Sequence, residues 1–306
     1  MNKILTILSV PAVLFMAACT NENLTDNTAE NGTDVVENRV MSFEAYHPSV
    51  ASRVGESAFE EGDCIGLYIT EYDGETARPL QISGNWANNV ATSFENGVWS
   101  TSKKIFWSNN KMDVYAYYPY MAPNSIDENL FEVQNDQSTA SAEGALGGYE
   151  ASDFLWAKAE AQEQDETADA VKLKFTHSMS RLVVNLKKGS DFEGEIPEDA
   201  VMYLHNVVTY GRIDFTNGAV VKDIYASPQT VKMRKLGRES FDAIVLPQHI
   251  ETRRPLVEMV AGGISYLLES SFSFKPGTMH TITLTINSNP DQIEIEIGGS
   301  TGGGWN

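Results

Sequence analysis

The sequence predicts an all-β protein built from β-sandwiches. Short segments alternate apolar and polar residues with a period of two, as in Val171–Phe175, Thr281–Ile286 and Gln292–Ile297. This period indicates strands with one buried and one exposed face, which is typical of antiparallel sheets covered on one side. Turn signals such as Asn96-Gly97 separate the strands. Amphipathic helices are scarce, and Asp153–Ala161 is a candidate for a short one.

The chain begins with a segment typical of an export signal. Lys3 precedes an apolar run, Ile4–Ala18, which is too short for a membrane-spanning helix of about 20 residues. The run ends in Met16-Ala17-Ala18-Cys19, which resembles the lipobox of bacterial lipoproteins. We therefore expect residues 1–18 to be a lipoprotein signal peptide and the Cys19 sulfur to carry a lipid. A plain secretory signal followed by a chance cysteine is the alternative.

A polar segment follows the expected lipidation site. Between Thr20 and Asn38 the only large apolar residues are Leu24, Val35 and Val36. Such a segment cannot bury enough apolar surface to offset the entropy lost on ordering. Residues 19–39 are therefore predicted to be a disordered tether.

Charge and motif content argue against several classes of function. The chain has 22 Lys and Arg against 42 Asp and Glu, a net charge of −20, which disfavours nucleic acid as a partner. The five histidines have no metal-binding spacing, and the motifs of zinc proteases, serine hydrolases and P-loop enzymes do not occur. We expect no enzymatic activity, no cofactor and no metal. A glycosidase-type carboxylate pair stays open, because such a pair meets only in the folded chain.

The folded body is expected to contain two domains. The stretch Glu160–Asp169 is acidic and alanine-rich, lacks large apolar residues and lies near the middle of the chain. We place the junction there, with one β-sandwich over residues 40–168 and another over residues 169–297. A long surface loop is the alternative interpretation of this stretch. The glycine-rich residues 298–306 are predicted to be a flexible tail.

Five motifs follow one another along the body. They are Phe59-x-x-Gly62-Asp63-x-Ile65-Gly66-Leu67-Tyr68, Phe106-Trp107 with Val114–Pro119, Asp153–Ala157, Leu173–Leu186 and Phe274–Leu284. In this order they resemble the fimbrillin (Mfa-like) family of lipoproteins, the building blocks of type V pili. The resemblance runs from about Met41 to about Asn287. It implies two transthyretin-like β-sandwich domains, export as a lipoprotein, and assembly outside the outer membrane at the cell surface.

The resemblance also implies assembly by donor-strand exchange. A trypsin-like protease cuts after an arginine, the first strand leaves, and a strand of a neighbouring subunit fills the exposed groove. The leaving strand is expected at residues 40–46, whose apolar side chains share one face: Met41, Phe43 and Ala45. Arg53 matches the place of the family's arginine and is the expected cleavage site, with an ordinary surface arginine as the alternative. Arg39 is the second choice, although a cut there would leave the strand in place.

The expected donor strand lies at the C-terminus. Glu294 and Glu296 alternate with three isoleucines, whose spacing matches alternate side chains of one strand: Ile293, Ile295 and Ile297. The alternative is that residues 292–297 complete the second sandwich of this chain, as in a tip or accessory subunit that donates nothing.

Two functional hypotheses follow. The first is a structural pilus subunit (stalk, tip or accessory), with other pilus subunits, a processing protease and, through the lipid, the outer membrane as partners. The second is a monomeric surface lipoprotein that binds glycan through aromatic residues, namely Trp99, Trp107 and Tyr115–Tyr120. Such aromatic residues more often fill a sandwich core. His177 is interpreted as a core histidine, and Arg181 is expected to pair with a backbone or carboxylate group.

Overall fold

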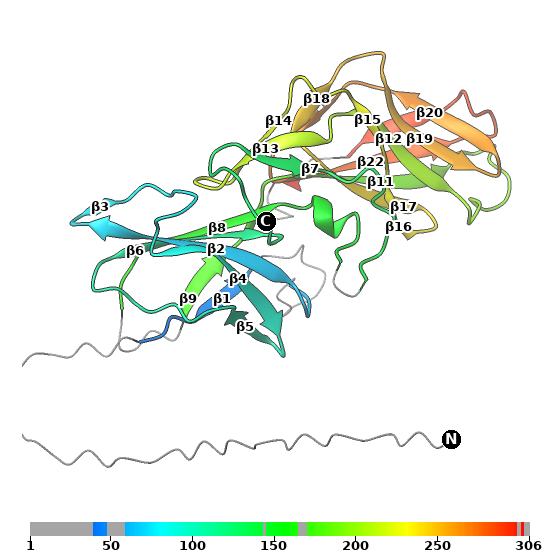
Figure 1. Ribbon diagram of the computed structural model, residues 1–306. Coiled ribbons are helices and arrows are strands. Elements are labelled where there is room, and N and C mark those ends of the chain that lie inside the picture. The colour runs from blue at the N-terminus through cyan, green and yellow to red at the C-terminus, as the bar shows by residue number, and fades with distance from the viewer. Residues whose placement is uncertain (1–38, 48–58, 143–144, 165–169, 299–300, 303–306) are drawn as a thin grey trace, which may run out of the picture. The chain divides into compact units, whose positions relative to one another are not determined.

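The computed structural model describes residues 39–47, 59–142, 145–164, 170–298 and 301–302 (Figure 1). Within these residues strands follow one another, and the single helical element is a turn of 3₁₀ helix, η1 (Glu150–Ser152). The predicted all-β fold is therefore confirmed. In the part of the chain that the structure describes, no helix is long and apolar enough to cross a membrane.

The first sandwich consists of a large sheet and a small one. The large sheet has the order β10-β8-β6-β2-β4-β5, with β3 paired to β2. Its strands are β2 (Cys64–Asp73), β3 (Thr76–Ala77), β4 (Ala87–Glu95), β5 (Val98–Thr101), β6 (Met112–Tyr118), β8 (Leu155–Gln162) and β10 (Thr176–His177). The small sheet is the parallel pair β1 (Phe43–Tyr46) and β9 (Val171–Lys174), which lies on one side of the large sheet in Figure 1.

The first hydrophobic core fills the space between these two sheets. The large sheet contributes alternate side chains of its central strands, such as Ile65, Leu67 and Ile69 of β2. The small sheet contributes alternate side chains of β1 and β9, and all of them are buried: Phe43, Ala45, Val171 and Leu173. Among the described residues, the second layer of this sandwich is therefore two strands wide.

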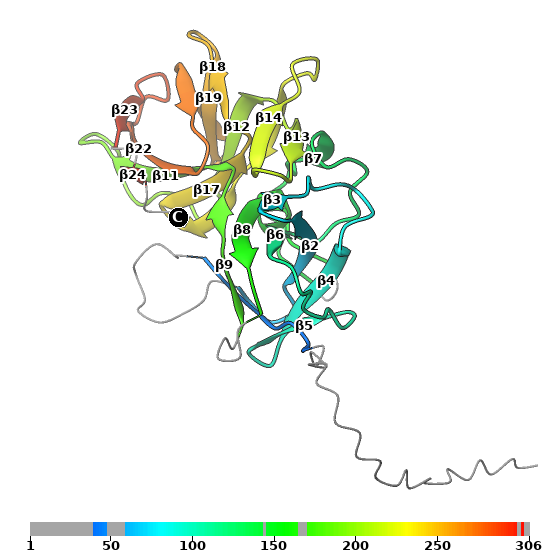
Figure 2. The same cartoon turned by 90° about the vertical axis from the view of Figure 1, so that its left-hand side faces the viewer.

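The second sandwich packs a six-stranded sheet on a four-stranded one (Figure 2). The larger sheet has the order β16-β17-β11-β22-β23, with β24 paired to β22, and the smaller has the order β15-β12-β19-β20. The strands are β11 (Ser180–Lys188), β12 (Val201–Val207), β15 (Gln229–Lys232), β16 (Arg234–Gly237), β17 (Ser240–Val245), β19 (Pro255–Ala261), β20 (Ile264–Glu269), β22 (Thr278–Ile286), β23 (Glu294–Ile297) and β24 (Thr301–Gly302). Pairing is antiparallel except between β11 and β22.

Two smaller sheets complete the body. One has the order β14-β13-β7 and joins β7 (Asn129–Glu132) to β13 (Tyr210–Asp214) and β14 (Ala219–Lys222). The other pairs β18 (Gln248–Ile250) with β21 (Phe272–Phe274). A third apolar cluster includes residues from both halves of the chain, among them Tyr68, Tyr117, Phe154, Phe215 and Ile244. The two sandwiches therefore share a hydrophobic core.

Three boundaries differ from the sequence predictions. The helix expected at Asp153–Ala161 is mostly strand β8, because Leu155 and Ala157 point into the first core while β6 pairs along the strand. β9 packs its apolar side chains in the first core, so this sandwich extends beyond the junction expected at residue 168. Within the expected tail, Thr301–Gly302 pairs with β22.

The central strands β2 and β6 are buried on both faces. Alternate side chains of these strands point into the first core. The side chains between them, such as Tyr68 and Tyr117, point to the opposite face and pack in the third cluster. This burial explains why Val114–Tyr118 is continuously apolar and aromatic rather than alternating. Gly66 lies opposite Tyr117 in the register, and a Cβ atom at Gly66 would collide with the Tyr117 ring.

We predict that Gly66→Ala lowers the free energy of unfolding by about 1–3 kcal/mol, the usual cost of overpacking a core. Gly237→Ala is the matched control, because no atom lies within 4 Å of a Cβ built there. Its effect should stay within about 0.5 kcal/mol. Urea unfolding followed by tryptophan fluorescence measures both values. Equal effects of the two substitutions would contradict the packing described for Gly66.

Candidate functional site

The expected leaving strand closes the first core. Met41, Phe43 and Ala45 are buried, with exposed fractions of 3%, 5% and 6%, whereas Glu44 and Tyr46 are exposed. The alternation expected from the sequence is therefore present. Because the second layer has only two strands, loss of β1 would remove about half of the strand cover from the first core and expose its apolar side chains.

Backbone hydrogen bonds hold the leaving strand on both edges. On one edge, β1 pairs in parallel with β9, and the Val171 amide donates to the Ser42 carbonyl oxygen at 2.9 Å. On the other edge, the Met41 amide donates to the Ile105 carbonyl oxygen (2.8 Å), and the Trp107 amide donates to that of Arg39 (2.9 Å). A strand that replaces β1 must restore these pairings as well as the apolar contacts, since unpaired buried backbone groups are costly.

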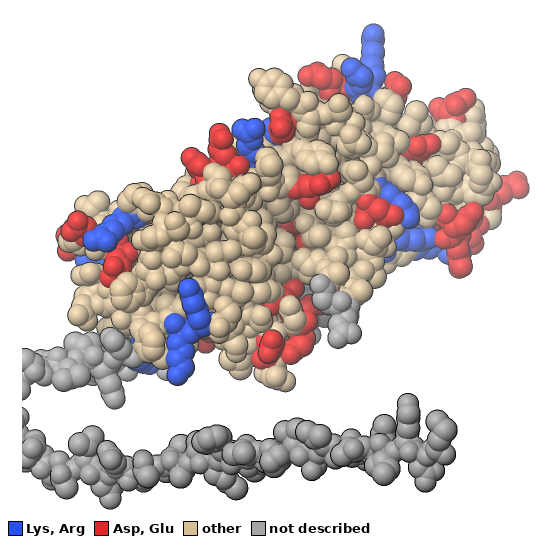
Figure 3. Space-filling model, in the orientation of Figure 1, with Lys and Arg blue, Asp and Glu red and all other residues tan. Residues whose placement is uncertain are grey.

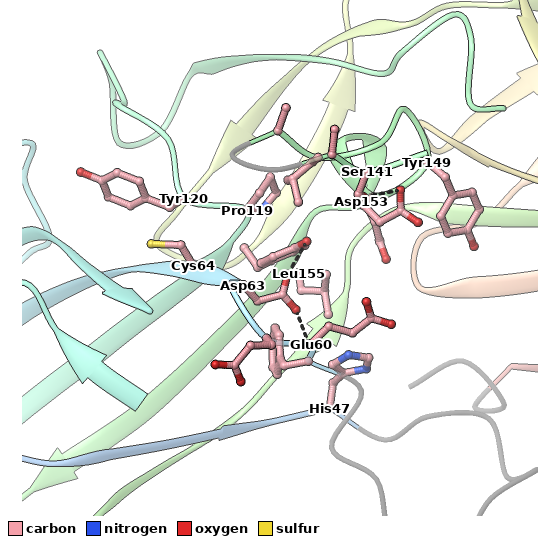
Figure 4. A pocket seen from close by; sticks show the side chains of 18 residues that line it. His47, Glu60, Asp63, Cys64, Pro119, Tyr120, Ser141, Tyr149, Asp153 and Leu155 are labelled. Carbon is pink, nitrogen blue, oxygen red and sulfur yellow. Dashed lines mark hydrogen bonds between the residues drawn. The ribbon is translucent and has the colours of Figure 1, made fainter. Parts of the chain in front are cut away.

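A cavity of about 650 Å³ lies at the end of β1 (Figure 4). His47, which follows β1, and Phe59, with which the described chain resumes, both line it. Carboxylates also line it, from Glu60, Glu61, Asp63, Glu150 and Asp153. Across the described ranges, no group of three or more His, Cys, Asp or Glu side chains could hold a metal ion.

Asp63 fixes the chain where β2 starts beside this cavity. Its Oδ2 accepts a hydrogen bond from the Glu60 amide at 2.7 Å, and its Oδ1 accepts one from the Tyr118 hydroxyl at 3.0 Å. Burial raises the pKa of the Asp63 carboxyl above its ordinary value, although both hydrogen bonds oppose the shift. Gly62 has a φ of +92°, a conformation that L side chains rarely adopt. The motif residues Gly62 and Asp63 thus form a fixed turn.

The structure places only one of the two candidate cleavage residues. Arg53, within residues 48–58, lies outside the described residues, and so does the expected lipidation site Cys19. Arg39 is described, and its carbonyl oxygen is bonded to the Trp107 amide just before β1. A cut after Arg39 would leave β1 in the core.

The expected donor strand pairs with its own chain in this structure. β23 is antiparallel to β22 at the edge of the six-stranded sheet, where Leu284 lies opposite Ile295. Ile293 and Ile295 are partly buried against the second core, and Ile297 is 61% exposed. β23 therefore covers the margin of a core that other strands already close.

The aromatic cluster considered for glycan binding is largely inside the protein. Trp107, Tyr115 and Tyr117 are buried, as is Tyr118, and Trp99 packs against the first core. Tyr120, 41% exposed, is the member most open to solvent. The hypothesis of a sugar-stacking platform at this cluster is wrong, because the rings pack against other side chains.

His177 and Arg181 lie near the junction of the two halves. The His177 Nδ1 lies 2.9 Å from the Asp153 carboxylate in a buried environment, which agrees with a core histidine. The Arg181 Nη2 lies 2.8 Å from the Asp242 carboxylate, as expected for an ion pair.

Sequence reasoning missed the second partner of Asp242. Arg234 contacts this fully buried carboxylate at 2.9 Å, its Nη1 lies 3.2 Å from Glu150, and its guanidinium stacks 3.3 Å above the Tyr149 ring. The signal available in the sequence was the β16–β17 hairpin, which places Arg234 opposite Asp242. This network links the second sandwich to the turn η1.

Sequence reasoning also missed a polar row on the second sandwich. The His205 Nδ1 lies 2.9 Å from the Thr230 hydroxyl, and its Nε2 lies 2.9 Å from the Glu258 carboxylate. The Ser265 hydroxyl donates to the same carboxylate at 2.6 Å, and these two partners lower the pKa of Glu258. The row runs across β15, β12, β19 and β20, so cross-strand pairing brings together residues far apart in sequence.

We predict that Phe43→Ala lowers the free energy of unfolding by about 3–5 kcal/mol, because it removes a buried aromatic ring from β1. Glu44→Ala changes the neighbouring exposed side chain and should cost less than about 1 kcal/mol. Chemical denaturation of the uncleaved chain gives both values. If Phe43→Ala costs no more than Glu44→Ala, then β1 does not seal the core.

The fold and this site define a protein of two β-sandwiches whose first core is closed by its own N-terminal strand. A family model described as fimbrillin-like matches residues 52–305, and the chain therefore belongs to the fimbrillin-like family. None of the curated proteins matches the chain.

Two solved structures of candidate cell adhesion proteins resemble this chain. That from Bacteroides ovatus ATCC 8483 has a TM-score of 0.66 and 17% identity, covering 86% of this chain and 97% of its own. That from Bacteroides uniformis ATCC 8492 has a TM-score of 0.60 and 17% identity, covering 85% of this chain and 97% of its own. These likenesses show a shared fold.

Proposed function

We propose that the chain is a structural subunit of a cell-surface pilus, assembled by protease-triggered donor-strand exchange. Membership in the fimbrillin-like family supports the pilus role. The observation that carries the exchange mechanism is the position of β1, which supplies one of the two strands in the second layer of the first core. Its removal would create an apolar groove with an unpaired strand edge, the kind of site that an added strand fills.

Processing would convert the anchored subunit into an assembly-competent one. The lipid on Cys19 and the tether 19–39 would hold the chain at the outer membrane. A trypsin-like protease would then cut after Arg53, with Arg39 as the second choice. A cut at Arg53 releases the lipid, the tether and β1 as one piece, because all three precede it in the sequence.

The cut would also change the thermodynamics of β1. Before it, β1 is joined covalently to the body, and its return to the groove is an intramolecular step. After it, the return depends on the concentration of the free fragment. A strand of an adjacent subunit can then displace the free β1 fragment from the groove. The candidate groove-filling residues of that strand are Ile293, Ile295 and Ile297. The partners are other pilus subunits, with the chain as stalk, tip or accessory subunit.

We predict that limited trypsin treatment of the unlipidated Cys19→Ser chain produces a new N-terminus at Val54. Electrophoresis without boiling should then show a ladder of detergent-resistant multimers, because strand exchange buries apolar surface and pairs a strand edge. N-terminal sequencing identifies the cut. Cleavage confined to residues 20–39, with the body still monomeric, would argue against the mechanism.

A disulfide lock tests whether β1 must leave. Glu44 and Lys172 are register partners with exposed side chains, so Glu44→Cys with Lys172→Cys, in a Cys64→Ser background, can tie β1 to β9. We predict that the oxidised variant is cleaved but stays monomeric and forms multimers after reduction. Glu44→Cys alone is the control and should form multimers under both conditions. Multimers from the fully oxidised variant would contradict departure of β1.

A further inference from the structure

Two exposed lysines beside the expected leaving strand form no ion pair with the described residues. Lys172 and Lys174 lie on the outer face of β9, opposite Glu44 and Tyr46 of β1. Within the described ranges, neither lysine has a carboxylate within 4.0 Å. In a chain with a net charge of −20, these two cations lie on one face of one strand. Figure 3 shows acidic groups spread over the face it draws.

The C-terminal strand has the opposite feature. Glu294 and Glu296 are exposed and two residues apart, so they project from the same face of β23. Their register partners on β22 are Thr285 and Thr283, which carry no charge. In this position the two glutamates also have no cation within 4.0 Å among the described residues.

We propose that the groove left by β1 selects the C-terminal strand of a second copy of this chain in one register, with Glu294 opposite Lys172 and Glu296 opposite Lys174. The proposal rests on the proposed function. It requires the incoming strand to run in the direction of β1, parallel to β9. The two lysines then meet two carboxylates, where β1 offers only Glu44.

This register also matches the apolar positions. Ile293 takes the place of Phe43, Ile295 that of Ala45, and Ile297 that of His47. At this last position the present side chain packs edge-on against Phe59, with ring centroids 4.9 Å apart. A shift of two residues would leave only one glutamate opposite a lysine, either Glu296 opposite Lys172 or Glu294 opposite Lys174. A shift of one would turn the isoleucines to solvent.

Charge sets the register and the rate of insertion, whereas apolar burial supplies most of the affinity. An exposed ion pair contributes little on its own, and its main effects are on partner choice and association rate. The selectivity should therefore weaken as salt rises.

Charge reversal tests the proposal on the Cys19→Ser chain with a sequence-specific protease site at residues 51–54. We expect Lys172→Glu with Lys174→Glu to slow multimer formation about fivefold or more at low salt, and Glu294→Lys with Glu296→Lys to do the same. A chain carrying all four changes should recover to within about twofold of the wild-type rate, since each pair is restored with reversed sign. Arg253→Glu with Arg254→Glu is the control for net charge, because both arginines are exposed and neither has a carboxylate within 4.0 Å among the described residues.

The outcomes distinguish failure of the proposed register from failure of the proposed function. If each reversed pair slows assembly and the fourfold variant does not recover, or if the control slows it equally, the charge-matched register is wrong while strand exchange stands. If the cleaved wild-type chain forms no multimers, the proposed function itself fails.

Cysteine trapping measures the register directly. All chains carry Cys64→Ser. An acceptor subunit with Lys172→Cys should form a disulfide with a donor subunit that carries Glu294→Cys, and not with one that carries Glu296→Cys. The reverse preference would overturn the proposed register.

Discussion

The pairing of β1 with β9 is the interaction on which the first sandwich depends. A layer of two strands covers a core that the large sheet supplies with side chains from β2, β4, β6 and β8. Each of the two strands therefore contributes more to closure than any strand of a wider sheet would. The same pairing also positions His47 and the cavity beyond it. Among the described strands, β1 comes first in the sequence, so a single cut after it would separate it from the rest of the chain.

The first and last long strands of the body, β1 and β23, differ in how much they contribute to the hydrophobic cores. The segment 39–46, which contains β1, has backbone hydrogen bonds on both edges and places Met41, Phe43 and Ala45 in the first core. β23 lies at the margin of the second core, pairs with one strand, and leaves Ile297 largely exposed. In the proposed exchange, β23 would be the donor end of the chain and the groove left by β1 would be the acceptor end. This asymmetry is what head-to-tail polymerisation requires.

The sequence was informative where structure is local and less so where it depends on distant pairing. Alternation at Met41, Phe43 and Ala45 identified the buried face of β1, since period two follows from strand geometry alone. The segment Asp153–Ala161 was a candidate for a short helix, but pairing with β6 makes most of it a strand. Nothing local indicates that β7 pairs with β13, because that pairing joins segments about eighty residues apart.

In the proposed exchange, the groove would keep its shape after β1 leaves, because the opposite face of the large sheet is held independently. Tyr68 of β2 and Tyr117 of β6 pack in the third cluster, against Phe154 and Phe215, and take no part in the first core. The buried Asp242 network ties the turn before β8 to the second sandwich. Losing β1 would therefore remove one of the two strands of the small sheet without releasing the large sheet beneath it. An acceptor fixed in this way would lose less conformational entropy when a new strand enters, which would favour the proposed exchange over unfolding of the opened domain.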